Sequence, residues 1–246
     1  MAVHSEGRDR ESIWQAMKRK EVYATTGHRI LLHFDLMNED SLKPMGSFVE
    51  SNTNPKFRVK AVGSFKQLPG CPDYVYEALS EKRLQKISDG ECYHPSDERY
   101  RLERIEVIKI TPQNNKDEDP STLIFDTWKT FECDSSQIEC EIEFVDDDFK
   151  NQQRDAVYYV RVIEEDTLLV NGSNFRTQFD ADGHPISVDP CYADYREDYE
   201  EECLGPGGHR AWSSPIFVDY KQKVSTDIMV SELNNIPQEN EKSNVN

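Results

Sequence analysis

Two segments in which apolar and charged residues alternate constrain the fold most strongly. In KFRVKAVGSF (56–65) three apolar residues alternate with Lys56, Arg58 and Lys60, and in QIECEIEF (137–144) every second residue is apolar and three of the others are glutamates. Side chains of successive strand residues point to opposite faces, so each segment predicts a strand with one buried and one solvated face. This pattern is typical of antiparallel β-sheets.

Four further segments predict strands by their content of β-branched and aromatic residues: RILLHFDL (29–36), LERIEVIKI (102–110), DAVYYVRVI (155–163) and RAWSSPIFVDY (210–220). Long polar segments separate them, at 66–100, where a short helix is expected around 76–87, and at 167–209. We therefore expect a mainly β fold: an antiparallel, sandwich-like β domain with long loops, preceded by one N-terminal helix.

The N-terminal helix is predicted over about residues 10–20. Asp9 is suited to cap it, and the three basic residues at 18–20 complement the dipole of its last turn. Ile13, Trp14 and Met17 fall on one face of this helix. If nothing in this chain covers that face, it is a surface for a partner or for self-association.

Charge and hydropathy exclude some classes of function. Lys and Arg number 29 against 47 Asp and Glu, which gives a formal net charge of −18. Binding to nucleic acid or to an anionic membrane surface requires a basic face, so neither is expected. No run of 18 apolar residues occurs, so no membrane insertion is expected, and the first residues, MAVHSEGRDRES, lack the apolar segment of a signal peptide.

The six cysteines form three sequence-local pairs that flank polar segments: Cys71 with Cys92, Cys133 with Cys140, and Cys191 with Cys203. No CxxC motif is present, so a structural zinc site is not expected. Three local disulfides would restrain these segments and would favour an oxidising compartment, periplasmic or extracellular. Six free thiols in a cytosolic protein remain the alternative, because sequence does not determine connectivity.

Candidate chemistry is sparse in the sequence. The six histidines show no HxH, HxxxH or HExxH spacing. In FDADGHP (179–185), Asp180 and Asp182 stand as in the first part of a calcium loop, but Cys191 occupies the position of the closing glutamate. ATTG (24–27) lacks the lysine of a phosphate-binding loop, so it is interpreted as a corner between helix and strand, with direct contact to a ligand as the alternative.

A resemblance adds to this interpretation. The segments AVHSEGRDRESIWQAMKRKEVYATTGHRILLHFDL, PMGS, FRVKAVGSFKQLPGCPDY, GECYHPSDER, RIEVIKI, DAVYYVRVIEE, DPCYADYR and RAWSSPIFVDY occur in this order over about residues 2–220. Together they resemble the C-terminal part of a bacterial family of unknown function, related to the PHP (polymerase and histidinol phosphatase) metallohydrolases and to carbaryl-hydrolase-like enzymes. Relatives with such cysteine-containing loops often carry export signals, which agrees with the disulfide prediction.

The resemblance implies a division of the chain. Residues 1–27 would be the end of a PHP-like barrel, 28–220 a β-rich C-terminal domain, and 221–246 a disordered tail. The catalytic divalent metals, held by an HxH motif, further histidines and carboxylates, and a late Asp-x-His, would lie in an upstream barrel. No cofactor is therefore expected in this chain, and the barrel, or a second copy, would be the partner of the Ile13, Trp14 and Met17 face.

The resemblance also implies which residues face the substrate or support residues that do. They are the residues expected nearest the barrel: His4, Glu6, Arg8, Thr25, Thr26 and Arg29. The expected function is thus a non-catalytic portion of a metal-dependent hydrolase. The alternatives are a stand-alone binding module whose acidic loops bind Ca²⁺ or a basic partner, and a complete small hydrolase that uses His4, Glu6 and His28.

Overall fold

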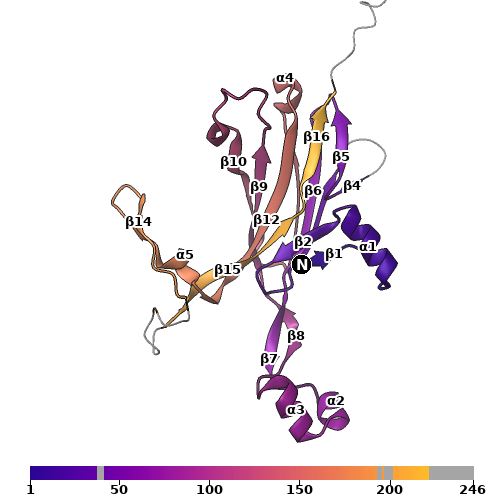
Figure 1. Cartoon of the computed structure of the whole chain (residues 1–246), viewed down its shortest axis with the longest axis vertical. Helices are drawn as coiled ribbons and strands as arrows, with labels where there is room; N and C mark the ends of the chain where they lie inside the picture. Colours follow the sequence, from indigo (N-terminus) through magenta and orange to yellow (C-terminus); the bar gives the residue numbers. More distant parts are fainter. Residues whose placement is uncertain (38–41, 193–195, 197–201, 222–246) are drawn as a thin grey trace, which may run out of the picture.

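Two β-sheets form the body of the protein. The computed structural model describes residues 1–37, 42–192, 196 and 202–221, and within these ranges the sheets pack face to face (Figure 1). The predicted disordered tail, 221–246, lies outside the described residues except for Lys221. The predicted antiparallel, sandwich-like β fold is confirmed.

The larger sheet has eight strands. Six follow the order β1 (Ala2–Val3), β2 (Val22–Thr25), β15 (Leu204–Ser213), β12 (Ala156–Val170), β16 (Ile216–Tyr220) and β5 (Phe48–Ser51). On its other side β12 pairs with β9 (Leu102–Ile110), which pairs with β10 (Ile124–Glu132). Every pair in this sheet is antiparallel except β16 with β5, which run parallel.

The smaller sheet contains four strands in the order β11 (Glu139–Val145), β6 (Lys56–Val62), β3 (Leu31–Leu36) and β4 (Lys43–Pro44). The alternation of apolar and charged residues in β6 and β11 gives this sheet one buried face and one outer face, as predicted. Phe57, Val59 and Ala61 of β6 are fully buried, whereas Lys56 and Lys60, which alternate with them, form ion pairs with glutamates of β11 on the outer face. The ring of Phe57 lies 4.6 Å from that of Tyr158 in β12, so the core joins the two sheets.

A buried ionic cluster lies within this core. Nζ of Lys109 is 2.6 Å from Oδ2 of Asp146, and the hydroxyl of Tyr158 donates a hydrogen bond of 2.6 Å to the same carboxylate oxygen. Burial, followed by the hydrogen bond to Asp146, raises the pKa of Tyr158 far above its ordinary value. Lys109 also donates to Gln152, at 3.1 Å, in the short helix α4 (Phe149–Gln152). The buried charges are thus paired and hydrogen-bonded, as burial requires.

Strand β12 is the longest element and is longer than predicted. The expected strand ended at residue 163, but β12 continues to Val170, with a register shift against β15 between Ile163 and Asp166. The predicted strand 210–220 is instead two strands, β15 and β16, because Ser214 and Pro215 interrupt it. Both pair with the same edge of β12.

Helix α1 (Arg10–Lys18) begins where predicted and ends two residues earlier than residue 20. Oδ1 of Asp9 accepts a hydrogen bond of 3.0 Å from the Ser12 amide, which caps the helix. Only Ala16 of this helix is buried. Strands β1 and β2, on either side of α1, belong to the larger sheet, and the proposed domain boundary at residue 27 stays a prediction.

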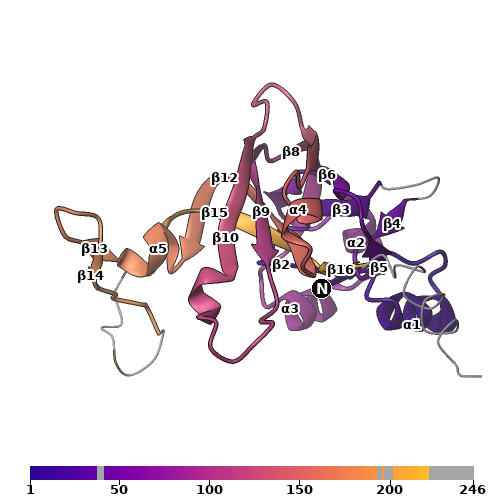
Figure 2. The same ribbon diagram turned by 90° about the horizontal axis from the view of Figure 1, so that it is seen from above.

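Two excursions project from the sandwich (Figures 1 and 2). The first is the hairpin of β7 (Phe65–Pro69) and β8 (Tyr93–Arg99), which carries α2 (Asp73–Ala78) and α3 (Glu81–Ser88) at its tip. Ser80 caps α3, so the single helix predicted over 76–87 is two helices. The second contains α5 (Gly172–Arg176), a turn with positive φ at most of its residues, and the hairpin of β13 (Gln178–Phe179) and β14 (Pro185–Ser187). A 3-10 helix, η1 (Pro120–Thr122), precedes β10.

The three predicted disulfide pairings are confirmed. Cys71 is bonded to Cys92 at the base of the α2 and α3 excursion, and Cys191 to Cys203 beside the second excursion. Cys133, which follows β10, is bonded to Cys140 in β11, so this bridge links the two sheets. Three disulfides are compatible with an extracellular or periplasmic location.

Candidate functional site

The segment Thr25 to Ile30 forms the corner between β2 of the larger sheet and β3 of the smaller one. The hydroxyl of Thr26 accepts a hydrogen bond of 2.9 Å from the Arg210 amide, and the Thr26 amide donates to the Arg210 carbonyl at 3.0 Å, so β15 fixes the corner. Gly27 has a φ of +131°, a conformation that residues with a side chain rarely adopt. The corner was predicted to join a helix to a strand, but it joins two strands, because β2 lies between α1 and the corner.

A buried carboxylate holds the histidine that follows the corner. Oε2 of Glu164 lies 2.7 Å from Nδ1 of His28, and its Oε1 accepts a hydrogen bond of 2.6 Å from the Ser64 amide. The Glu164 side chain is 0% exposed. Because a carboxylate only accepts, the His28 ring carries a proton on Nδ1, which leaves Nε2 as the free nitrogen of a ring in fixed orientation. The sequence interpretation missed Glu164.

His28 lies between two other rings. Its centroid is 3.6 Å from that of His209 in β15 and 4.5 Å from that of Tyr100, and both arrangements are stacked. Nδ1 of His209 lies 3.0 Å from the hydroxyl of Thr26. Burial lowers the pKa of His209, and the neighbouring His28 lowers it further, while Glu164 acts in the opposite direction. His209 is therefore uncharged near neutral pH, and two positive charges in contact are avoided.

A pocket of about 430 Å³ lies between this corner and the β7–β8 hairpin. The corner contributes Gly27, His28 and Arg29, and the other lining residues are Ser64, Phe65, Gln67, Tyr93 and Pro95. His209, Thr26 and Arg210 line a second pocket, of about 590 Å³, together with residues of β12 and α5. The stacked rings of His28 and His209 thus line different pockets, one each. Of the predicted residues, Thr26 and Arg29 lie here.

The predicted residues near the N-terminus lie at the other end of β2. His4 follows β1, and its Nε2 lies 2.8 Å from the carbonyl oxygen of Leu32, with its ring 4.4 Å from that of His33. Glu6 and Arg8 are exposed in the segment that leads to α1. The backbone amide of His4 donates to Glu21, just before β2, whereas the corner follows the last residue of β2. The structure therefore does not bring the two predicted groups together.

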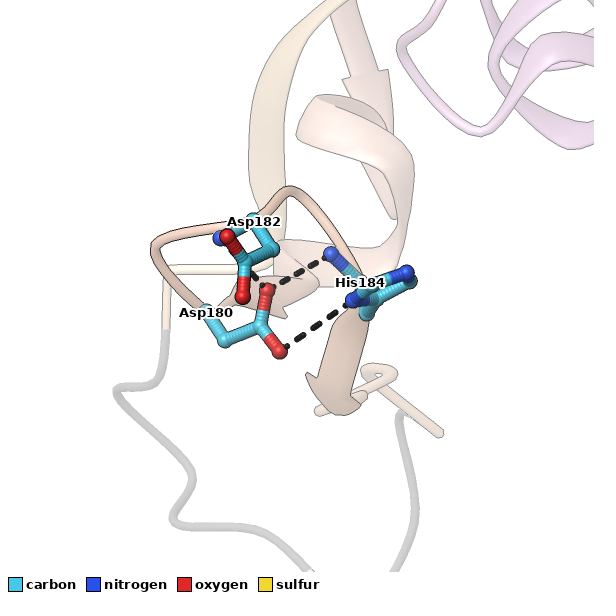
Figure 3. Close-up of side chains that lie close together, drawn as sticks. All are labelled: Asp180, Asp182 and His184. Atoms are coloured by element: carbon cyan, nitrogen blue, oxygen red, sulfur yellow. Dashed lines mark hydrogen bonds and ion pairs between the residues drawn. The ribbon is translucent and has the colours of Figure 1, made fainter.

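An acidic turn at the tip of the β13–β14 hairpin contains the predicted calcium candidates (Figure 3). Ligand atoms of Asp180, Asp182 and His184 lie within 4.8 Å of one another, and all three residues are exposed. Oδ1 of Asp180 accepts hydrogen bonds from the amides of Asp182, at 2.9 Å, and His184, at 2.8 Å, so one oxygen already closes the turn. Sequence reasoning missed His184 as a possible ligand. His184 forms an Asp-x-His spacing with Asp182, so the expectation that every motif of the barrel type lies outside this chain is wrong for Asp-x-His.

Among the described residues, no other group of three His, Cys, Asp or Glu side chains places its ligand atoms this close together. The hypothesis of a complete small hydrolase requires His4, Glu6 and His28 to form one metal site. These three described residues do not form such a group. None of the described helices is long and apolar enough to cross a membrane.

Comparison with known proteins gives a partial match. Residues 1–62 match the model of a family described as "Protein of unknown function (DUF3604)". The matched segment runs from β1 to the end of β6 and includes α1 and the corner, where the sequence resemblance begins. It supports the expected relationship to a family of unknown function. No curated protein and no solved structure matches the chain.

Proposed function

We propose that this chain is the β-rich, non-catalytic portion of a PHP-like, metal-dependent hydrolase, and that α1 joins it to the catalytic barrel. The observation that carries the proposal is the apolar face of α1. Trp14 is 50% exposed and Met17 is 37% exposed, although the helix has the spacing of one that buries an apolar stripe. With Ile13, Arg10 and Glu11 they line a shallow depression of about 600 Å³.

Two further observations support a barrel as the occupant of this surface. Helix α1 lies in the segment that matches the family of unknown function. In the sequence resemblance it corresponds to the last helix of a PHP-like barrel, whose apolar side would pack on the barrel strands.

The non-catalytic part of the proposal is tested with the purified chain. Incubated with p-nitrophenyl phosphate and with Mn²⁺ or Zn²⁺, it should release p-nitrophenol no faster than a blank that contains the metal alone. A rate well above that blank, lost on addition of chelator, would overturn this part of the proposal.

The docking part is tested by sedimentation velocity with a separately produced barrel unit of a DUF3604-type protein. The chain should co-sediment with the barrel, and Trp14→Asp should weaken the complex by about tenfold or more, because a central aromatic anchor is lost. Ile87→Asp is the matched control, since Ile87 is an exposed apolar residue of α3 and should have no effect. If the chain associates only with itself, and Trp14→Asp abolishes this association, the partner of the α1 face is a second copy of the chain and not the barrel.

A second candidate function is cation binding by the acidic turn of Asp180, Asp182 and His184. The proximity of three ligand atoms favours it, and carboxylate oxygens are the donors that Ca²⁺ prefers, whereas the imidazole suits Zn²⁺ better. Calorimetric titration with Ca²⁺ and with Zn²⁺ distinguishes the two ions. Binding heat that disappears in Asp182→Asn and persists in Asp166→Asn would support cation binding by this turn; Asp166 is an exposed residue of β12. Absence of heat with both ions would exclude cation binding. The hypothesis of a stand-alone binding module also includes binding of a basic partner by the acidic loops.

A further inference from the structure

Ser64 lines the pocket beside His28, and its buried hydroxyl has no partner within the described part of the chain. Ser64 is 2% exposed, and its amide donates to Glu164 while its carbonyl accepts from the Tyr100 amide at 2.8 Å. Its Oγ makes no hydrogen bond to any described residue. Buried hydroxyls are nearly always hydrogen-bonded, because desolvating one without a partner costs about 1–3 kcal/mol. A ligand that accepts a hydrogen bond here would remove that cost.

The same pocket contains a cation without a counter-charge. Arg29 is exposed at the pocket wall and makes no ion pair or hydrogen bond with another described residue. The nearby carboxylate of Glu164 is fully buried and is engaged by His28 and by the Ser64 amide. In a chain with a net charge of −18, this arginine offers the pocket a positive charge that no described carboxylate pairs with.

His28 completes the polar side of the pocket. Glu164 holds its Nδ1, so Nε2 is the ring nitrogen left for a ligand, and stacking on Tyr100 and His209 limits rotation of the ring. With a second ring proton, Nε2 donates to an anion, and Glu164 balances the charge of the ring. A fixed donor loses little conformational freedom on binding.

Two aromatic side chains give the pocket an apolar part. Phe65 of β7 and Tyr93 of β8 line it, and both are exposed. Its volume of about 430 Å³ falls in the range of small-molecule sites. A cation would be repelled by Arg29, and an anion without an apolar part would leave these rings uncovered.

We propose that this pocket binds a small organic oxyanion, a carboxylate or a phosphate monoester attached to an apolar body. Arg29 would pair with the oxyanion, Ser64 and His28 would donate hydrogen bonds to it, and Phe65 and Tyr93 would contact the body. Planar pairing of a guanidinium with two oxygens is the geometry that arginine offers to either anion. The inference concerns this chain alone and does not depend on docking of α1.

The test is calorimetric titration of the whole chain with phenyl phosphate, with benzoate and with neutral benzyl alcohol. We expect saturable binding of at least one anion, with a Kd below about 1 mM, and none of benzyl alcohol. Arg29→Gln should weaken anion binding by about tenfold or more, and Ser64→Ala by about threefold or more. Arg83→Gln, the same change on exposed α3, is the matched control and should bind as the unaltered protein does.

Each outcome of these titrations either supports or overturns the proposal of an oxyanion site. Removal of Ser64 Oγ breaks no described hydrogen bond and Arg29 is exposed, so both variants should keep the melting temperature of the unaltered protein. Equal binding of benzyl alcohol would show an apolar site without anion recognition. Absence of saturation by any anion up to about 20 mM, or anion binding that Arg29→Gln leaves unchanged, would overturn the proposal.

Discussion

Nδ1 of His28 lies 2.7 Å from Oε2 of Glu164, across a sequence separation of 136 residues. The contact connects the corner between the two sheets with the longest strand of the fold, and the second oxygen of the same carboxylate holds the Ser64 amide at the end of β6. One buried side chain of β12 therefore sets the positions of two segments that line the pocket. The arrangement depends on a carboxylate, since both of its oxygens accept.

Glu164→Gln should destabilise the protein by about 2–3 kcal/mol. An amide side chain accepts at one oxygen only and presents N–H groups to a neighbouring donor, so one buried hydrogen bond is lost without replacement. Urea denaturation followed by circular dichroism measures the change. Asp166→Asn, on the same strand and exposed, should change the unfolding free energy by less than about 0.5 kcal/mol. Equal effects of the two substitutions would contradict the role assigned to Glu164.

His209 should make the protein less stable in mild acid. Burial and the adjacent His28 lower its pKa from the ordinary value of 6.5, so the unfolded chain binds its proton more readily than the folded one. Stability from this group is therefore complete above pH 6.5 and decreases as the pH falls from 6.5 through the folded pKa, with a limiting slope of about 1.4 kcal/mol per pH unit.

The pH effect is measured by urea denaturation between pH 5 and pH 8 for the unaltered protein and for His209→Gln. The variant should lose part of the acid-dependent decrease, and the remainder is expected because burial also lowers the pKa of His33. Parallel pH profiles of the two proteins would show that His209 is not the group responsible.

Asp146→Ala should destabilise the protein by about 3–5 kcal/mol, because it leaves Lys109 charged and buried and removes the acceptor of the Tyr158 hydroxyl. Asp147→Ala, the exposed neighbour, is the control. In the double variant Lys109→Met/Asp146→Leu no buried charge is left unpaired, so it should be more stable than Asp146→Ala. If the double variant is the less stable of the two, the unpaired charge of Lys109 is not the main cause of the destabilisation in Asp146→Ala.

Removal of the disulfides should have unequal effects. Replacing Cys133 and Cys140 with serine should lower the unfolding free energy by about 2 kcal/mol or more, because this bridge links two sheets and Cys140 belongs to the core. Replacing Cys71 and Cys92 should change it much less, although that loop is longer. Between residues 65 and 99, all of them described, Cys71 alone is buried, so the excursion opens without exposing the core. A larger effect at Cys71 and Cys92 would contradict this.

The fold was predictable from sequence where strand periodicity is strong. Strand β9 has the predicted bounds, and β6 and β11 were recognised by alternation. Strands β2 and β5 have four residues each, too few to show a period, and the β15 segment LGPGGHRA contains glycines and a proline that usually mark a loop. Partners across the sheet, which no local pattern reports, stabilise these strands.

The site was predictable in part, and one missed residue had a signal. Continuing the alternation of Tyr158, Val160 and Val162 places Glu164 on the same buried face, so a glutamate at a core position marks a carboxylate with a structural or functional partner. The identity of the partners could not be predicted. His28 and His209 are brought together only by the pairing of β2 with β15, and short-range sequence contains no information on that pairing.

The order of strands in the larger sheet has a consequence for biosynthesis. Strand β2 pairs with β15, and β5 pairs with β16, so strands made within the first 51 residues receive their neighbours from residues 204–220. While the ribosome makes residues 52–203, β2 and β5 have no strand on the sides that β15 and β16 later occupy. Folding therefore follows synthesis of nearly the whole described chain, and such long-range pairing is slow and leaves strand edges open to aggregation. A chaperone that shields the nascent N-terminal strands should raise the yield of folded protein.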